Sequence, residues 1–180
     1  LARSGSRTPA STSGTIAITA TNAPTIGNAA APLRSTALSA GPILRRVNSP
    51  NAARNWQRTM DVNVNGTFNV TQAFLPALRA ARGTIVNVAS IAGYAGQGGS
   101  LGYSPSKGAI RLYTQSLAAE LAKDGVRVNA LAPGVIETPM TAATRGNPER
   151  LEKFMSRIPM GRVGQPHELI GPVVFLSSPM

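Results

Sequence analysis

The sequence predicts an α/β fold in which a doubly wound parallel sheet carries helices on both faces. Two short segments rich in β-branched residues, 84–89 and 126–131, have the length and composition of buried strands. Longer segments with helical apolar spacing, at about 55–79 and 104–123, precede them. Alternating helices and strands form parallel sheets with right-handed crossovers. We therefore expect the two strands to be adjacent and parallel.

Composition excludes several classes of protein. The 180 residues are 42% hydrophobic, enough for one domain with a core, and no apolar run approaches the roughly 20 residues of a membrane span. The chain lacks cysteine, which excludes disulfides and thiolate zinc sites and fits a cytoplasmic location. His167 is the one histidine, so no metal site is expected. We predict that His167 is an exposed residue in the first turn of a last helix spanning about 166–176.

The positive charge is unevenly distributed. The net charge is +11, and residues 1–60 hold seven arginines but no Lys, Asp or Glu. A basic arm of this kind can bind nucleic acid or an anionic surface. Here the arginines are scattered, and only Arg45 and Arg46 are adjacent. The pattern argues against nucleic-acid binding and leaves a non-catalytic basic interaction protein as an alternative.

Two domain segments are predicted. Residues 1–37 are rich in small and polar residues and lack a helical period, so they are expected to be irregular, with one short strand near 15–19. Residues 38–180 form the predicted catalytic domain. The chain begins with Leu1 rather than Met, which indicates a fragment.

Three polar side chains define the candidate active site. Ser90 follows the first predicted strand, at the carboxyl end where open α/β sheets bind ligands. Tyr103 and Lys107 are four residues apart and share one helix face if the first turn includes Tyr103. An ammonium beside a phenol favours the phenolate, which can exchange a proton with a hydroxyl or carbonyl group. Ser90 could hydrogen-bond the same oxygen.

The spacing S-x12-Y-x3-K, with a strand before it and a helix after it, resembles the short-chain dehydrogenase/reductase family. The resemblance covers roughly residues 39–180. It includes Asp61-Val62-Asn63-Val64-Asn65-Gly66 in the first helix and Ala132-Pro133-Gly134-Val135-Ile136-Glu137-Thr138 after the second strand. The match of Ser39-Ala40-Gly41 to the family's Asn-Ala-Gly is weaker.

The resemblance implies a role for each of these residues. Tyr103 is the acid/base, Lys107 lowers its pKa and binds the nicotinamide ribose, and Ser90 positions the reacting oxygen. Asn63 lies where the helix opens and holds a relay water. The implied cofactor-binding residues are Tyr103, Lys107, Pro133, Gly134, Ile136 and Thr138.

The resemblance also implies a Rossmann-like fold whose first βαβ units and last strand are not recognisable here. The implied activity is NAD(P)-dependent interconversion of a secondary alcohol and a ketone by hydride transfer. The cofactor would be NAD or NADP and the partner a small-molecule alcohol or ketone. Within the family the chain is most similar to 3-oxoacyl-carrier-protein reductases and sugar or polyol dehydrogenases. The two long helices would form a homodimer or homotetramer interface, and residues 141–160 a lid over the substrate.

A serine hydrolase is a second hypothesis. Residues 98–102 read G-x-S-x-G, and Ser100, then Asp124 or Glu137, then His167 follow the chain order of a Ser–acid–His triad. That motif requires its serine at a strand-to-helix turn, whereas the predicted strand ends about ten residues earlier. The glycine-rich loop at 93–102 is more consistent with a substrate-side loop.

The first testable prediction concerns cofactor affinity. Dinucleotide-binding folds hold the pyrophosphate on a glycine-rich turn at a helix N-terminus. The sequence contains neither G-x-x-x-G-x-G nor G-x-G-x-x-G. Losing several charge-assisted hydrogen bonds of about 1.5–3 kcal/mol each weakens binding by several orders of magnitude. Calorimetric titration of the 180-residue chain with NAD(H) and NADP(H) should therefore show no useful binding, and a micromolar dissociation constant would contradict this prediction.

Overall fold

The computed structural model describes residues 15–18 and 50–178. Most of the segment expected to be irregular, 1–37, and the Ser39-Ala40-Gly41 match lie outside the described residues. Within them the chain alternates helices and strands, as the sequence predicted.

Three parallel strands form the sheet. They are β1 (Thr15–Ile18), β2 (Thr84–Val88) and β3 (Arg127–Leu131), in the order β1-β2-β3. Thr84 pairs with Thr15 on one side and Arg127 on the other. The predicted parallel pairing of the segments at 84–89 and 126–131 is confirmed, as is the short strand near 15–19. The central position of β2 explains why four of its five residues are buried, since it has neighbours on both edges.

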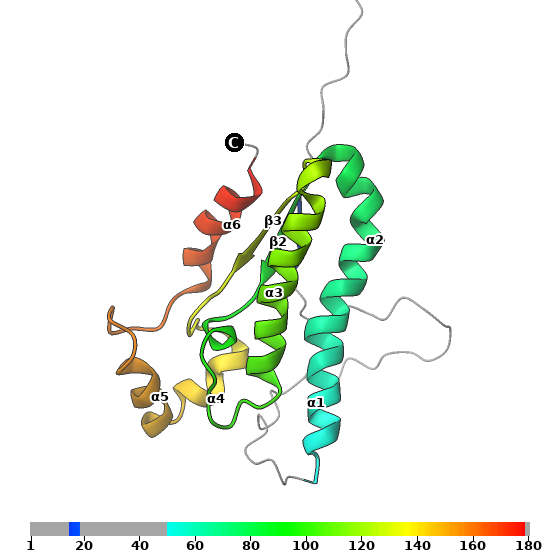
Figure 1. Ribbon diagram of the computed structural model, residues 1–180. Helices are drawn as coiled ribbons and strands as arrows, with labels where there is room; N and C mark the ends of the chain where they lie inside the picture. The colour runs from blue at the N-terminus through cyan, green and yellow to red at the C-terminus, as the bar shows by residue number, and fades with distance from the viewer. Residues whose placement is uncertain (1–14, 19–49, 179–180) are drawn as a thin grey trace, which may run out of the picture.

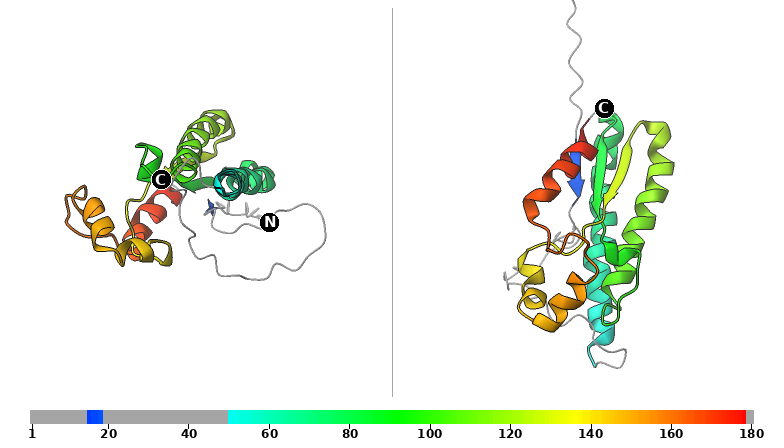
Figure 2. Two further views of the ribbon diagram at one scale, coloured as in Figure 1. Left: turned by 90° about the horizontal axis from the view of Figure 1, so that it is seen from below. Right: turned by 90° about the vertical axis from the view of Figure 1, so that its left-hand side faces the viewer.

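Helices cover both faces of this sheet (Figures 1 and 2). On one face α2 (Gly66–Ala81) contacts β1, and α3 (Tyr103–Leu121) contacts β2 and β3. On the other face α6 (Ile170–Ser177) contacts all three strands. The main apolar cluster lies between the sheet and the α2–α3 layer; it consists of Leu78, Ile85, Leu117, Leu121, Val126 and Val128.

The helix predicted at 55–79 is longer and interrupted. It comprises α1 (Ala52–Met60), a π-helical segment η1 (Asp61–Asn65) and α2. Arg82 ends it in the left-handed region with φ 48°, and the N–H of Gly83 returns to the Leu78 carbonyl at 2.9 Å. This closure satisfies helix-end carbonyls and turns the chain directly into β2.

The remaining elements connect these layers. They are η2 (Ile91–Gly93), η3 (Ala122–Asp124), η4 (Pro139–Thr141), α4 (Ala142–Arg145), α5 (Pro148–Met155) and η5 (Pro166–Leu169). The second long helix begins at Tyr103 and ends at Leu121, close to its predicted limits of 104–123. The last helix was predicted as one element but forms a short 3-10 turn followed by α6.

Arg127 joins α6 to the sheet through hydrogen bonds. Its guanidinium donates to the carbonyls of Leu176 at 3.1 Å and Ser178 at 2.8 Å, and to the Thr84 hydroxyl at 2.8 Å. A guanidinium presents several donors in a fixed plane. Arg127, the first residue of β3, can therefore bind carbonyls at the end of α6 and the hydroxyl of Thr84, the first residue of β2.

None of the helices in the described part of the chain is long and apolar enough to span a membrane.

Core packing yields the second prediction. Leu121 is fully buried in the main cluster, whereas Leu112 on the same helix is 55% exposed. Leu121→Ala should lower the free energy of unfolding by about 2–5 kcal/mol, because the change removes buried methyl groups and leaves a cavity. Urea unfolding followed by circular dichroism measures this, with Leu112→Ala as the control of equal chemistry. Equal losses in both variants would place Leu121 outside the core.

Candidate functional site

Lys107 is a buried cation at the centre of the candidate site. It lies in the first turns of α3, with 8% of its surface exposed. Its Nζ donates to the carbonyl oxygen of Val88, the last residue of β2, at 2.8 Å. Burial lowers the pKa of Lys107 from 10.5 to about 8, because the charged form loses solvation. The same Nζ lies 5.8 Å from the centroid of the Tyr103 ring. The two residues therefore share one helix face, as the sequence predicted.

Ser90 lies two residues beyond β2, where the strand ends meet. Its hydroxyl accepts a hydrogen bond from the Ala92 N–H at 3.1 Å and so caps η2. The N–H of the next residue, Ile91, donates to the Pro133 carbonyl at 3.1 Å. This bond brings the Ser90 segment against the turn that follows β3. Ser90 and Lys107 are thus gathered at the carboxyl end of β2, although among residues 50–178 no hydrogen bond joins Ser90 to Tyr103.

Asn63 reaches α3 from the π-helical segment. Its side-chain amide donates to the Ser106 hydroxyl at 2.9 Å, and Ser106 donates to the Tyr103 carbonyl at 2.7 Å. Single π turns occur often at functional sites, where they re-aim side chains. The structure therefore connects Asn63 to the helix turn that carries Tyr103 and Lys107. Sequence reasoning missed Ser106, and only its position beside Lys107 could have indicated it.

A glycine permits the close approach of η2 to α3. A Cβ added to Gly93 would lie 2.7 Å from the carbonyl carbon and oxygen of Lys107, nearer than real Cβ contacts. These are backbone atoms, so no side-chain rotation can relieve the clash. The absence of a side chain at Gly93 therefore allows the Ser90 loop to lie directly against the backbone of Lys107.

The turn after β3, residues 133–138, carries the other predicted binding residues. Ile136 forms a parallel bridge with Gly164, in which the Glu137 N–H donates to the Gly164 carbonyl at 2.8 Å and the Gly164 N–H donates to Val135 at 2.9 Å. The Ile136 carbonyl accepts from the Thr141 hydroxyl at 2.6 Å. Its N–H has no partner in the described part of the chain, so it can donate to a ligand. Pro133, Gly134 and Thr138 belong to the same turn.

Thr141 fixes the shape of this turn. Its hydroxyl donates to Ile136, accepts from the Thr138 N–H at 3.1 Å, and lies within 3.5 Å of the Thr138 hydroxyl. The three residues lie within one turn of chain, so a single hydroxyl sets the direction of the Ile136 and Thr138 peptides. Sequence reasoning did not identify Thr141, because a threonine in a mixed polar segment gives no pattern.

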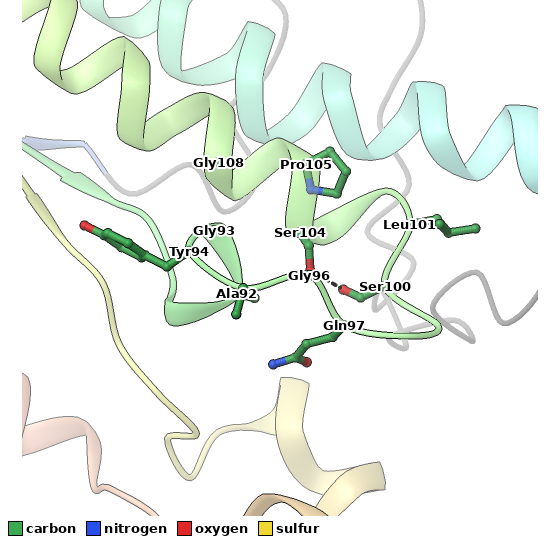
Figure 3. A pocket seen from close by; sticks show the side chains of 11 residues that line it. Ala92, Gly93, Tyr94, Gly96, Gln97, Ser100, Leu101, Ser104, Pro105 and Gly108 are labelled. Atoms are coloured by element: carbon green, nitrogen blue, oxygen red, sulfur yellow. Dashed lines mark hydrogen bonds between the residues drawn. The ribbon is translucent and has the colours of Figure 1, made fainter. Parts of the chain in front are cut away.

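The glycine-rich loop and α3 enclose a hollow of about 330 Å³ (Figure 3). Its lining residues are Ala92, Gly93, Tyr94, Ala95, Gly96, Gln97, Ser100, Leu101, Ser104, Pro105 and Gly108. In Figure 3 the Ser104 hydroxyl points to that of Ser100, at 3.1 Å. Tyr94, at the rim, stacks against the Arg111 guanidinium, whose central carbon is 4.8 Å from the ring centroid.

The residues of the hydrolase hypothesis have separate partners. Ser100 bonds to Ser104, Asp124 pairs with Arg79 at 2.7 Å, and Glu137 pairs with Arg145 at 2.8 Å. His167 is exposed on η5, as predicted, and no contact joins it to Ser100 among residues 50–178. The described part of the chain also contains no cluster of three His, Cys, Asp or Glu side chains that could hold a metal.

Comparison with known proteins agrees with this geometry. A family model described as enoyl-(acyl carrier protein) reductase matches residues 35–180. The chain is 44% identical over 125 residues to the 3-oxoacyl-[acyl-carrier-protein] reductase of Thermotoga maritima, covering 68% of this chain and 50% of that protein. It is 44% identical over 127 residues to the L-tagatose-forming galactitol 2-dehydrogenase of Cereibacter sphaeroides, covering 69% and 50%.

Solved structures show the same likeness. The gluconate 5-dehydrogenase of Burkholderia cenocepacia, in complex with NADP and tartrate, matches with a TM-score of 0.68 and 31% identity, over 77% of this chain and 56% of that one. A 3-oxoacyl-[acyl-carrier protein] reductase of Brucella melitensis with bound NAD matches with a TM-score of 0.63 and 40% identity, over 71% and 46%. The chain thus spans about half the length of the curated relatives it matches, and it belongs to the short-chain dehydrogenase/reductase family.

Proposed function

We propose that the protein is an NAD(P)-dependent oxidoreductase that interconverts a secondary alcohol and a ketone. The observation that carries this proposal is the placement of Tyr103 beside the buried ammonium of Lys107, at the carboxyl end of β2 and close to Ser90. A phenol, an ammonium and a hydroxyl at one strand end are suited to moving a proton on and off an oxygen. The names of the similar proteins, which include a reductase of 3-oxoacyl groups and a polyol dehydrogenase, support this reaction class.

Each side chain has a distinct role in this proposal. Tyr103 donates a proton to the carbonyl oxygen during reduction and removes it from the hydroxyl during oxidation. The ammonium of Lys107 stabilises the negative charge that develops on the phenol oxygen. Ser90 hydrogen-bonds the reacting oxygen and holds it near Tyr103. Asn63 acts through Ser106 and the first turn of α3, and holds the water that relays protons to Lys107.

The residues present fit the nicotinamide end of a dinucleotide. Lys107 uses one of its three N–H donors on Val88, which leaves two donors for ribose hydroxyls. The N–H of Ile136, which has no partner in the part of the chain that the structure describes, suits a carboxamide oxygen. Pro133, Gly134 and Thr138 form the rest of the turn. When bound, NAD(P)H would supply the hydride for reduction and NAD(P)+ would accept it during oxidation, while the protein supplies orientation and charge.

The alternatives receive less support from the geometry. A serine hydrolase requires Ser100, an acid and His167 to contact one another, whereas each has another partner or lies exposed. A basic interaction protein binds its partner through exposed cations, whereas Lys107 is only 8% exposed and lies next to a tyrosine. A non-catalytic fragment does not explain this arrangement.

We further infer a homodimer or homotetramer in the cytoplasm. Large apolar side chains are exposed on the outer surface of the α1–α3 layer: Trp56 at 42%, Phe68 at 47%, Phe74 at 46% and Leu112 at 55%. An apolar surface of this kind is typical of a protein interface. The lack of cysteine supports the location.

The third prediction tests the acid/base. In the catalytically active form of the protein, Tyr103→Phe should lower kcat by about 10²–10⁴-fold, because it removes the proton donor but keeps the ring. Tyr113→Phe is the matched control, since Tyr113 packs against the main apolar cluster, edge-on to Phe68, and belongs to neither the proposed site nor the hollow. Steady-state kinetics with circular dichroism of each variant provides the measurement. Near-normal turnover of Tyr103→Phe would remove Tyr103 from this role.

The fourth prediction concerns the charge of Lys107. Its folded pKa of about 8 lies below the unfolded value of 10.5. Below pH 8 both states carry the proton; between pH 8 and 10.5 the unfolded chain binds more protons, so stability rises with pH there. The gain is at most about 3 kcal/mol. Urea unfolding at pH 7 and 10 should show this increase in the wild type and lose it in Lys107→Met.

The exposed Lys123 offers a control for this measurement. Lys123→Met should keep the wild-type difference between pH 7 and pH 10, since it removes a solvated charge. The same difference in wild type and Lys107→Met would show that the ammonium of Lys107 carries no desolvation penalty.

A further inference from the structure

We propose that Glu137 is a positioning residue that couples the nicotinamide turn to the lid. The nicotinamide turn is defined as residues 133–138, and the lid keeps the bounds expected from the sequence, residues 141–160. The consequence for catalysis rests on the proposed function, in which this turn contacts the cofactor. The bracing itself depends only on contacts within the chain.

The carboxylate of Glu137 binds one partner with each oxygen. Oε1 accepts from the Arg145 guanidinium at 2.8 Å, and Oε2 accepts from the side-chain amide of Gln165 at 2.8 Å. Arg145 ends α4, and Gln165 precedes η5. One side chain therefore connects three segments: the turn, the lid and the stretch that leads to α6.

The backbone of Glu137 is held at the same place. Its N–H donates to Gly164, one residue before Gln165, so main chain and side chain both bind the 164–165 segment. The approach at Gly164 is close, because a Cβ there would lie 2.6 Å from Ile136 Cδ1. The turn consequently cannot slide along this segment without breaking both bonds.

Arg145 carries the connection on to the backbone of the turn. Besides Glu137, it donates to the Thr138 carbonyl at 3.3 Å and lies 3.5 Å from the Thr141 hydroxyl, which in turn holds the Ile136 carbonyl. A displacement of α4 would thus reach the Ile136 peptide, whose N–H has no partner among the described residues and is assigned to the cofactor in the proposed function. The neighbouring ion pair, Arg162 with Glu168, braces η5 but does not contact the turn.

The test compares two ion pairs in the 180-residue chain. Glu137→Gln keeps the shape of the side chain but removes its charge and one hydrogen-bond acceptor. In this pair the Glu137 side chain is 43% exposed and the Arg145 side chain 28%. Asp124→Asn removes the ion pair with Arg79, which lies away from the turn. In that pair the Asp124 side chain is 25% exposed and the Arg79 side chain 45%. Amide hydrogen exchange of residues 136–146 should become about threefold to tenfold faster in Glu137→Gln and stay unchanged in Asp124→Asn. Unchanged exchange in both variants would overturn the proposal.

A double variant separates bracing from general loosening. Arg145 also donates to the Thr138 carbonyl, so Glu137→Gln/Arg145→Gln should exchange faster at residue 137 than Glu137→Gln alone, but by less than the sum of the two single effects. Independent, additive effects of the two substitutions would show that the side chains act separately and would contradict the coupling.

Nicotinamide mononucleotide is the probe for ligand positioning. Titrated at millimolar concentration and followed by the amide resonance of Ile136, it should bind Glu137→Gln about threefold to tenfold more weakly than wild type and Asp124→Asn. Faster exchange without a change in this affinity would make Glu137 merely structural and overturn its positioning role. If the probe leaves the wild-type resonance unmoved, the cofactor role of the turn fails, and hydrogen exchange still decides whether Glu137 braces it.

Discussion

The hydrogen bond from Lys107 to the Val88 carbonyl is the interaction on which the rest of the site depends. A buried ammonium is costly unless an acceptor compensates its lost solvation. The last carbonyl of a central parallel strand is such an acceptor, and it lies where α3 begins. The bond therefore fixes the start of α3 against the end of β2, and Gly93 supplies the space for the intervening loop. Tyr103 and Ser90 acquire their positions from this arrangement.

The sequence predicted those parts of the protein that depend on local pattern. Strands rich in β-branched residues and the four-residue spacing of Tyr103 and Lys107 are properties of neighbouring residues, and both were confirmed. Asn63 was expected where the helix opens, and η1 lies there, but its bond to Ser106 and the contacts of Glu137 were missed. They join residues 43, 8 and 28 positions apart, so they exist only once the tertiary structure has formed. No helical or strand period encodes such pairs.

Periodicity also failed to separate core from surface on the first long helix. Trp56, Phe68 and Thr71 all follow the predicted 3–4 spacing of the buried face. Trp56 and Phe68 are nevertheless 42% and 47% exposed, and of the three only Thr71 is fully buried. Thr71 donates to the carbonyl one turn earlier, at 2.9 Å, and so satisfies its hydroxyl inside the core. An apolar stripe indicates that one face of a helix is covered. It does not show whether the sheet of the same chain or a second protein chain covers that face.

The two halves of the site are stabilised by different forces. Ser90, Tyr103 and Lys107 belong to the layer that holds the main apolar cluster, whose residues are almost fully buried. The nicotinamide turn and the lid instead depend on polar ties between partly exposed groups, through Glu137, Arg145 and Thr141. Buried apolar contacts open only with global unfolding, whereas exposed hydrogen bonds open locally at low cost. Under the proposed function, this division holds Ser90, Tyr103 and Lys107 in place through global packing, whereas the turn and lid depend on contacts that open locally.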